Sequence, residues 1–207
     1  MLKIKNTEVF GLERTILASG NSFAKTEIDT ARYHIEPVYE KDYKRAFKLG
    51  SSTECHQSHD SFLKGVIVQF DIQYPQYWSM EAQRYHWFDI VMSSSKMHRL
   101  AYLASQSNEE FRKQFNEYVD DDVILKCQEY AEKYNSCENQ DGKYFYFMKL
   151  VSNLPMGYEL WMTVSTNYLQ LKTMYIQRKD HKLKEDWGAF CDWCLSLPMF
   201  SELTGLS

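Results

Sequence analysis

The chain has 207 residues, and its 24 Lys and Arg against 28 Asp and Glu give a formal charge of −4. Hydrophobic residues make up 44% and charged residues 25%, which excludes a chain that is mostly disordered. The acidic balance disfavours nucleic acid as the main partner. Aromatic residues reach 15% beside only 8 Gly and 4 Pro, so we expect an aromatic-rich, mostly helical domain.

The N-terminal stretch has no apolar core followed by a small-residue cleavage site, and no run of apolar residues is long enough to cross a bilayer. We therefore expect neither a signal peptide nor a membrane partner. The five cysteines are an odd number in a chain that is large enough to fold without disulfides. Reduced thiols and a cytoplasmic location are the simpler prediction.

The first part of the chain alternates strand and helix signals. Apolar and polar alternation or β-branched and aromatic enrichment predicts strands over 2–9, 31–38 and 62–72. Helices are predicted over 11–18 and 41–49, and Gly50 ends the second of these. Pro75 then opens a long predicted helix that ends at the serines 93–95.

The second part reads as mostly helical. Helices are predicted over 109–118, 123–134, 166–177 and the segment that begins near Trp187 and ends before Pro198. A buried element of unassigned type is expected over 144–151. The polar stretch 135–142 is the best internal boundary within a single domain spanning 1–207. The prediction is a helix-rich α+β domain with a small mixed or antiparallel sheet.

Two groups of residues have metal-ligand spacing. Cys55, His56 and His59 lie close together, and Cys191 and Cys194 form a C-x-x-C pair. Thiolates and imidazoles at such spacings bind zinc. The C-x-x-C pair shares a helix face with Trp187, however, so ordinary core cysteines are the favoured interpretation, and no metal site is predicted.

Other short motifs have competing interpretations. Ser93 and Lys96 have the Ser-x-x-Lys spacing of a nucleophilic serine, but the motifs that accompany it are missing, so a polar break between helices is favoured. No glycine-rich phosphate loop occurs. The basic cluster 178–182 either complements the C-terminal dipole of a helix or places Arg178 against an anion.

The C-terminal third carries a Leu-Pro pair at Pro155, then Asn167 twelve residues after the proline and Arg178 eleven residues after the asparagine. This order and spacing resemble the flavin-dependent thymidylate synthase family, which has an Asn and an Arg on one helix after a Leu-Pro. Upstream, His59 before the strand at 62–72 and Gln83 are similar to a family histidine and to the Gln ahead of the family's Arg-His-Arg motif.

The resemblance implies an α+β fold of the thymidylate synthase complementing type. It also implies conversion of dUMP to dTMP with FAD, NADPH and methylene tetrahydrofolate, in a homotetramer with sites at subunit interfaces. The chain departs from the family where His86-Trp87-Phe88 replaces Arg-His-Arg, where 94–99 lacks the Glu-x-Ser-x-Arg-Tyr pattern, and where Val151 replaces an arginine. Since arginine binds phosphate with bidentate geometry, these losses predict altered or lost methyl transfer and weakened FAD binding.

The predicted site binds a nucleotide or a related anion, and its members fall into three groups. The general acid or base candidates are His86 and His98, because imidazole is the side chain most often used for proton transfer in catalysis. The resemblance assigns His59, Gln83 and Asn167 to the cofactor. The substrate-binding candidates are Lys96, Arg99 and Arg178.

Other functions stay open. The chain also resembles uncharacterised phage and prophage proteins of Gram-positive bacteria that share its Met-His-Arg at 97–99 and its basic stretch at 178–183. The alternative function is a non-enzymatic interaction protein of a mobile element, such as an anti-defence factor, because many aromatics suit an interface. A nucleic-acid binder that uses Lys179, Lys182, Lys184 and Tyr175 is the third option.

Overall fold

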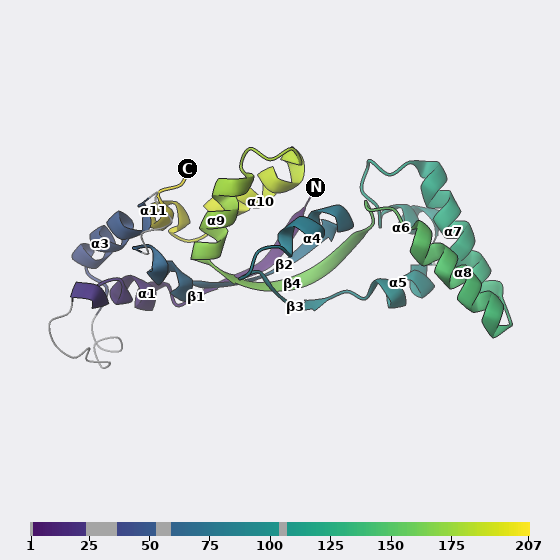
Figure 1. The fold of residues 1–207 in the computed structure, drawn as a ribbon, viewed down its shortest axis with the longest axis horizontal. Coiled ribbons are helices and arrows are strands. Elements are labelled where there is room, and N and C mark those ends of the chain that lie inside the picture. The colour runs from purple at the N-terminus through teal and green to yellow at the C-terminus, as the bar shows by residue number, and fades with distance from the viewer. Residues whose placement is uncertain (1, 24–36, 53–58, 104–106) are drawn as a thin grey trace. The chain divides into compact units, whose positions relative to one another are not determined.

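A computed structural model describes residues 2–23, 37–52, 59–103 and 107–207 (Figure 1). The predicted strand at 31–38 and the Cys55-His56 part of the possible metal motif lie largely outside these ranges. Within the described residues, no helix has both the length and the apolar character needed to cross a membrane.

Four strands form one sheet in the order β1-β2-β4-β3. They are β1 (Lys3–Phe10), β2 (Ile67–Pro75), β3 (Asp89–Ser93) and β4 (Glu159–Asn167). Neighbouring strands run antiparallel. Alternate side chains of β2 are buried, which is the pattern of a strand with one face on the core.

Helices make up most of the remaining described chain. They are α1 (Leu12–Ala18), α3 (Glu40–Gly50), α4 (Gln76–Ala82), α5 (Lys96–Leu103), α6 (Asn108–Arg112), α7 (Asp121–Ser136), α8 (Gln140–Asn153), α9 (Tyr168–Arg178), α10 (Lys184–Ser196) and α11 (Phe200–Thr204). Short 3₁₀ turns occur at η1 (Asn21–Phe23) and η2 (Ser61–Gly65). The predicted helix-rich α+β class with an antiparallel sheet is confirmed.

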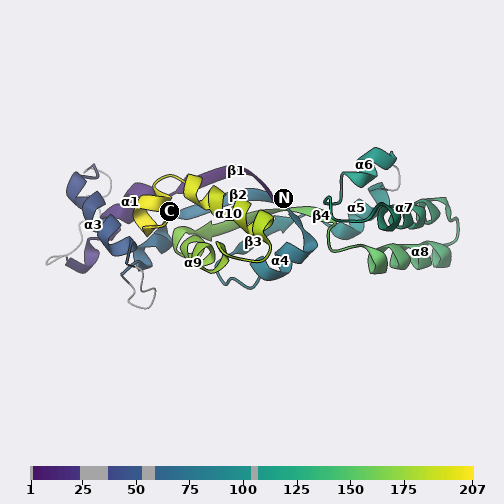
Figure 2. The same cartoon turned by 90° about the horizontal axis from the view of Figure 1, so that it is seen from above.

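The chain forms two compact units that are interleaved along the sequence. The α7 unit contains Met1–Lys3, Ile72–Arg84 and Ile90–Thr163. The α9 unit contains Ile4–Asp71, Tyr85–Asp89 and Val164–Ser207. The polar stretch 135–142 is the turn of a hairpin inside the α7 unit, where α7 and α8 pack side by side (Figure 2). Whether the whole chain folds as one domain stays a prediction.

Two element predictions around β2 and α4 are wrong in part. The strand expected over 62–72 begins only at Ile67, because 61–65 closes into a 3₁₀ turn, and it continues to Pro75. The long helix expected after Pro75 ends at Ala82, and 89–93 is the strand β3. All five residues of β3 are exposed, so neither face shows the alternation that identifies a strand in a sequence.

Other element predictions also needed correction. The strand β4 was not predicted, and the helix expected from 166 begins at Tyr168 after it. The segment 144–151, which was expected to be buried, is part of α8 and is half exposed, with Leu150 as the helix's buried residue. The helix expected over 109–118 ends at Arg112.

Aromatic side chains form much of the core of the α9 unit, where α9 and α10 lie on one face of the sheet (Figures 1 and 2). Phe70 of β2 packs with its ring centroid 4.4 Å from that of Trp193 and 6.1 Å from that of Phe88. Trp187 and Phe190 of α10 are fully buried and 5.5 Å apart. The aromatic surplus is therefore largely core packing in this unit.

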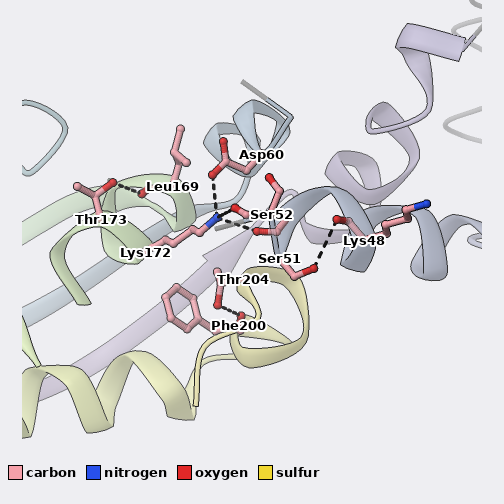
Figure 3. A network of polar contacts seen from close by, with 10 residues as sticks. Lys48, Ser51, Ser52, Asp60, Leu169, Lys172, Thr173, Phe200 and Thr204 are labelled. Atoms are coloured by element: carbon pink, nitrogen blue, oxygen red, sulfur yellow. Dashed lines mark hydrogen bonds and ion pairs between the residues drawn. The ribbon is translucent and has the colours of Figure 1, made fainter. Parts of the chain in front are cut away.

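A buried ammonium joins three elements of the same unit (Figure 3). Lys172 of α9 is 1% exposed, and its Nζ donates to the carbonyl oxygens of Gly50 at 2.8 Å and Ser52 at 3.1 Å. Its third partner is the Asp60 carboxylate at 2.8 Å, which is also buried. Because Gly50 is the last residue of α3, Lys172 satisfies a helix-terminal carbonyl from another part of the chain.

Replacing Lys172 by Met should lower the free energy of unfolding by about 3–5 kcal/mol, because the buried Asp60 carboxylate and two carbonyls lose their donor. Lys179→Met, which removes an exposed cation at the end of the same helix, is the matched control. Urea unfolding followed by circular dichroism measures both. A loss below about 1 kcal/mol in Lys172→Met would show that the network contributes little net stability.

Candidate functional site

Helix α9 carries Asn167 at its start and Arg178 at its end. Eleven residues are close to three helical turns, so the two positions differ by about 20° around the axis and about 16 Å along it. Both side chains therefore project from nearly the same face of one helix. The spacing that suggested a shared site in the sequence thus corresponds to a shared helix face.

Asn167 is the N-cap of α9 and is 7% exposed. Its Oδ1 accepts a hydrogen bond from the backbone N–H of Gln170 at 2.9 Å, so the cap fixes which end of the amide points to the helix. The Nδ2 group then points the other way, and it has no acceptor among the described residues. A buried amide with an unused donor can bind a carbonyl oxygen or an anion.

Arg178 is half-buried in the last turn of α9. Its Nε donates to the Tyr85 hydroxyl at 2.8 Å, and its Cζ lies 4.7 Å from the centroid of the Trp187 ring. The Tyr85 ring centroid is 5.5 Å from the same Cζ. Tyr85 in turn donates from its hydroxyl to Gln177 Oε1 at 2.9 Å. The guanidinium is thus bound in place by aromatic neighbours.

The segment that carries Tyr85 is also bonded to α9 at Gln170 and to the end of β4 at Thr166. The backbone N–H of Trp87 donates to Gln170 Oε1 at 3.2 Å. Its carbonyl accepts from Thr166 Oγ1 at 2.6 Å. Gln170 and Gln177 are seven residues apart and hence lie on one face of the helix. These two side chains hold residues 85–87 alongside α9.

The three residues that replace the family's Arg-His-Arg have different environments. Phe88 is buried against Phe70 and Phe190, so it belongs to the core. Trp87 is 51% exposed, and His86 is exposed with its ring centroid 4.6 Å from that of Trp87. This part of the site is therefore aromatic and carries one imidazole, with no fixed positive charge.

Trp87 and Asn167 line one cavity of about 340 Å³ at the start of α9. Lys64 and Asp89 bring one charge of each sign to it, and Ile67, Ser165 and Thr166 complete the lining. This volume lies near the lower end for small-molecule pockets. The cavity therefore suits a single planar ring with a carbonyl acceptor.

His59 is exposed and lines a different cavity of about 540 Å³. Its other lining residues come from α1, η1, α3 and η2, and they are Ala18, Ser19, Ser22, Leu49, Ser61 and Phe62. None of them lines the cavity at Asn167. In these two cavities, His59 and Asn167 are therefore apart.

The remaining candidates belong to the α7 unit. Gln83 is exposed just after α4, and His98 is exposed on α5. Lys96 Nζ donates to Gln76 Oε1 at 3.2 Å, and Arg99 donates to Gln114. These four residues lie in the α7 unit, whereas His86, Asn167 and Arg178 lie in the α9 unit. A single pocket that contains all seven therefore stays a prediction.

One buried phenol accompanies Arg99 in the α7 unit. Tyr158 is fully buried, and its hydroxyl has no hydrogen-bond partner among the described residues. Burial raises the pKa of Tyr158, and the positive charge of Arg99 opposes that rise. The phenol is therefore neutral at physiological pH, where it can only donate or accept a hydrogen bond.

The cysteines have the environment expected of core residues. Cys191 and Cys194 are buried in α10. Burial raises the pKa of Cys191 to about 11 and raises that of Cys194 well above its ordinary value. The described residues hold no group of three or more His, Cys, Asp or Glu side chains placed to bind a metal.

The serine motif is structural. Ser95 Oγ accepts from the backbone N–H of His98 at 3.3 Å in the first turn of α5. Ser94 exchanges hydrogen bonds with Trp161 of β4, with its backbone N–H 2.8 Å from the Trp161 carbonyl. The predicted break between two helices is wrong in part, because Ser93 ends the strand β3 and α5 begins at Lys96, so the serines separate a strand from a helix.

Sequence reasoning missed several residues that shape the site, above all Tyr85, Gln170, Gln177 and Lys172. The two glutamines are weakly recognisable in the sequence as a pair that acts together, because their spacing of seven places both on one helix face. Lys172 carries none, since a lysine in an amphipathic helix ordinarily faces solvent. Tyr85 is two residues from Gln83, but nothing in the sequence pairs it with Arg178.

No protein-family model matches the sequence, and no curated protein matches it. Two structures of the thymidylate synthase ThyX from Helicobacter pylori, both with FAD and dUMP, are 15% identical to this chain, with TM-scores of 0.69 and 0.67. The alignments cover 99% and 98% of this chain and 97% and 96% of those chains.

A UMP/dUMP methylase, PolB from Streptomyces cacaoi bound with 5-Br dUMP, is 11% identical, with a TM-score of 0.60. That alignment covers 100% of this chain and 95% of the other. At such low identity these matches show the fold alone. The chain has a ThyX-like fold, as the family resemblance implied.

Proposed function

We propose that this protein binds a pyrimidine nucleotide of the dUMP class. The observation that carries the proposal is the position of Asn167 and Arg178 on one face of α9, inside a fold whose neighbours hold dUMP or 5-Br dUMP. The planar guanidinium of Arg178 suits a phosphate or an imide ring. Lys96 and Arg99 stay substrate-binding candidates within the α7 unit.

We also propose that the chemistry differs from methyl transfer in ThyX enzymes. His86 and His98 are exposed imidazoles, and they are the candidates for a general acid or base. In place of the family's cationic motif, the chain has a half-exposed indole and a buried Phe88. A nucleotide-modifying transferase with changed chemistry and a binding protein without catalysis both fit this change.

The cavity at Asn167 fits part of a flavin. Its volume of about 340 Å³, its exposed indole and the Asn167 amide suit one planar ring system. A pyrophosphate needs several cationic or N–H donors, and this lining offers the single cation Lys64 opposite Asp89. The residues therefore do not fit intact FAD, and we derive no reaction step through it.

We further propose a homo-oligomer, a tetramer by family resemblance. The α7 unit exposes many large apolar side chains, which are Met80, Ile90, Val91, Met92, Met97, Tyr102, Tyr118, Val123, Leu125, Tyr144, Phe145, Met148 and Met156. Strand β3 also lies at an edge of the sheet. Exposed apolar side chains and an unpaired sheet edge are features that another copy of the chain can cover.

A cytoplasmic location and a phage or prophage source are proposed from the reduced-thiol composition and the second resemblance. The same exposed surface supports the alternative function, an interaction protein of a mobile element that covers this surface with a partner.

We expect dUMP to raise the melting temperature of the purified protein and Arg178→Ala to abolish the rise, because a ligand that binds only the folded state stabilises it. Lys179→Ala is the matched control, since it removes the neighbouring exposed cation and should keep the shift. Each variant is compared with its own ligand-free melting temperature. No shift with dUMP or any other nucleotide in the wild-type protein contradicts the proposed function.

The freshly purified protein should contain far less than one flavin per chain, because the cavity lacks donors for a pyrophosphate. The visible absorbance spectrum before and after denaturation measures the content. Protein that is yellow with one FAD per chain would overturn this expectation.

Light scattering during size-exclusion chromatography should give a mass near four times the 24.6 kDa chain. Replacing Val91 and Met92 of β3 by Lys should lower that mass, because charges on an exposed apolar edge oppose its burial. A monomer in the wild-type protein contradicts the oligomer and would favour a surface reserved for another partner.

A further inference from the structure

A nucleotide binds Arg178 more tightly when the guanidinium is already held in one orientation. An arginine side chain loses about 2 kcal/mol of conformational free energy when it is fixed, so a free arginine is a costly partner for a ligand. Arg178 already has restraints of two kinds, the hydrogen bond from its Nε to the Tyr85 hydroxyl at 2.8 Å and the Trp187 ring at 4.7 Å.

These restraints are themselves rigid. Trp187 is fully buried and packs edge-on against Phe190 at 5.5 Å. The Tyr85 hydroxyl uses its acceptor on Arg178 and its donor on Gln177 at 2.9 Å, so its orientation is fixed from both sides. Two residues later the backbone of Trp87 is bonded to Gln170 and Thr166. The phenol therefore has little freedom to move away.

We infer that Tyr85 is a positioning residue that holds the Arg178 guanidinium against Trp187 for the nucleotide. This inference rests on the proposed function, and it assigns Tyr85 a role through Arg178 with no contact to the ligand. Because Nε is bonded to the phenol, the plane of the guanidinium is set before the ligand arrives. Preorganisation of this kind raises affinity by lowering the ordering cost of binding.

Tyr85→Phe removes one oxygen and keeps the ring, so it tests the hydrogen bonds alone. We expect the dissociation constant for dUMP, measured by calorimetry, to rise about five- to tenfold. Tyr175→Phe is the matched control, because it also removes one phenol oxygen, but from a side chain of the same helix whose hydroxyl donates to the Ser207 carbonyl. It should leave the dUMP affinity unchanged.

A double-mutant cycle separates positioning from general stability. With Arg178 replaced by Lys, which keeps a positive charge but has no Nε–H for the phenol, Tyr85→Phe should cause no further loss of dUMP affinity. Additive losses in the double variant would overturn the inference, because the phenol would then act independently of the arginine. An unchanged affinity in Tyr85→Phe alone would overturn it as well.

The Arg178 Nε–H also has a signature that needs no ligand. Its proton signal should exchange slowly with solvent in the wild-type protein and in Tyr175→Phe, and fast in Tyr85→Phe. If the wild-type protein binds no dUMP, the proposed function fails, and this signal then decides the positioning by itself. Persistence of slow exchange in Tyr85→Phe overturns the inference.

Discussion

The buried ammonium of Lys172 is the constraint on which the arrangement of α9 depends. Each of its three N–H groups has a partner, two carbonyls at the end of α3 and the Asp60 carboxylate ahead of η2 (Figure 3). A buried charge is tolerated only when it is paired and fully hydrogen-bonded, as it is here. The helix is therefore fixed in both its rotation and its height relative to α3 and η2.

With α9 held in place by Lys172, the residues on its other faces determine which parts of the unit the helix contacts. The step from Asn167 to Lys172 is five residues, or about 140° around the helix, so the ammonium and the Asn167–Arg178 face point in different directions. Gln170 and Gln177 bond the aromatic segment 85–87 along the helix between them. Helix α10 adds Trp187 beside Arg178.

The sequence was sufficient for elements whose signal is local. The alternation in β1, the glycine that ends α3 and the apolar face of α10 all gave correct predictions. Strand β3 was missed because all of its residues are exposed, so burial leaves no period in its sequence. The 3₁₀ turn at 61–65 was taken for strand because its Phe62 and Leu63 have the composition of one.

The site was predictable only where spacing along one helix determined it. Eleven residues from Asn167 to Arg178 imply a shared face, and the structure has that face. The partners that act on it come from far away in the sequence, as Tyr85 and Asp60 do, with separations of 93 and 112 residues from Arg178 and Lys172. A single sequence holds no physical signal for such pairs.

The direction in which Lys172 points has a consequence for how this fold diverges. The side chains that anchor α9 and those that would meet a ligand occupy different sectors of the same helix, so substitutions on one sector need not disturb the other. A lineage can exchange an arginine-rich segment for an aromatic one and keep its architecture, because the anchoring bonds are made elsewhere. A fold can be kept at 15% identity when the side chains that anchor α9 and those that would contact a ligand lie on different faces of the helix.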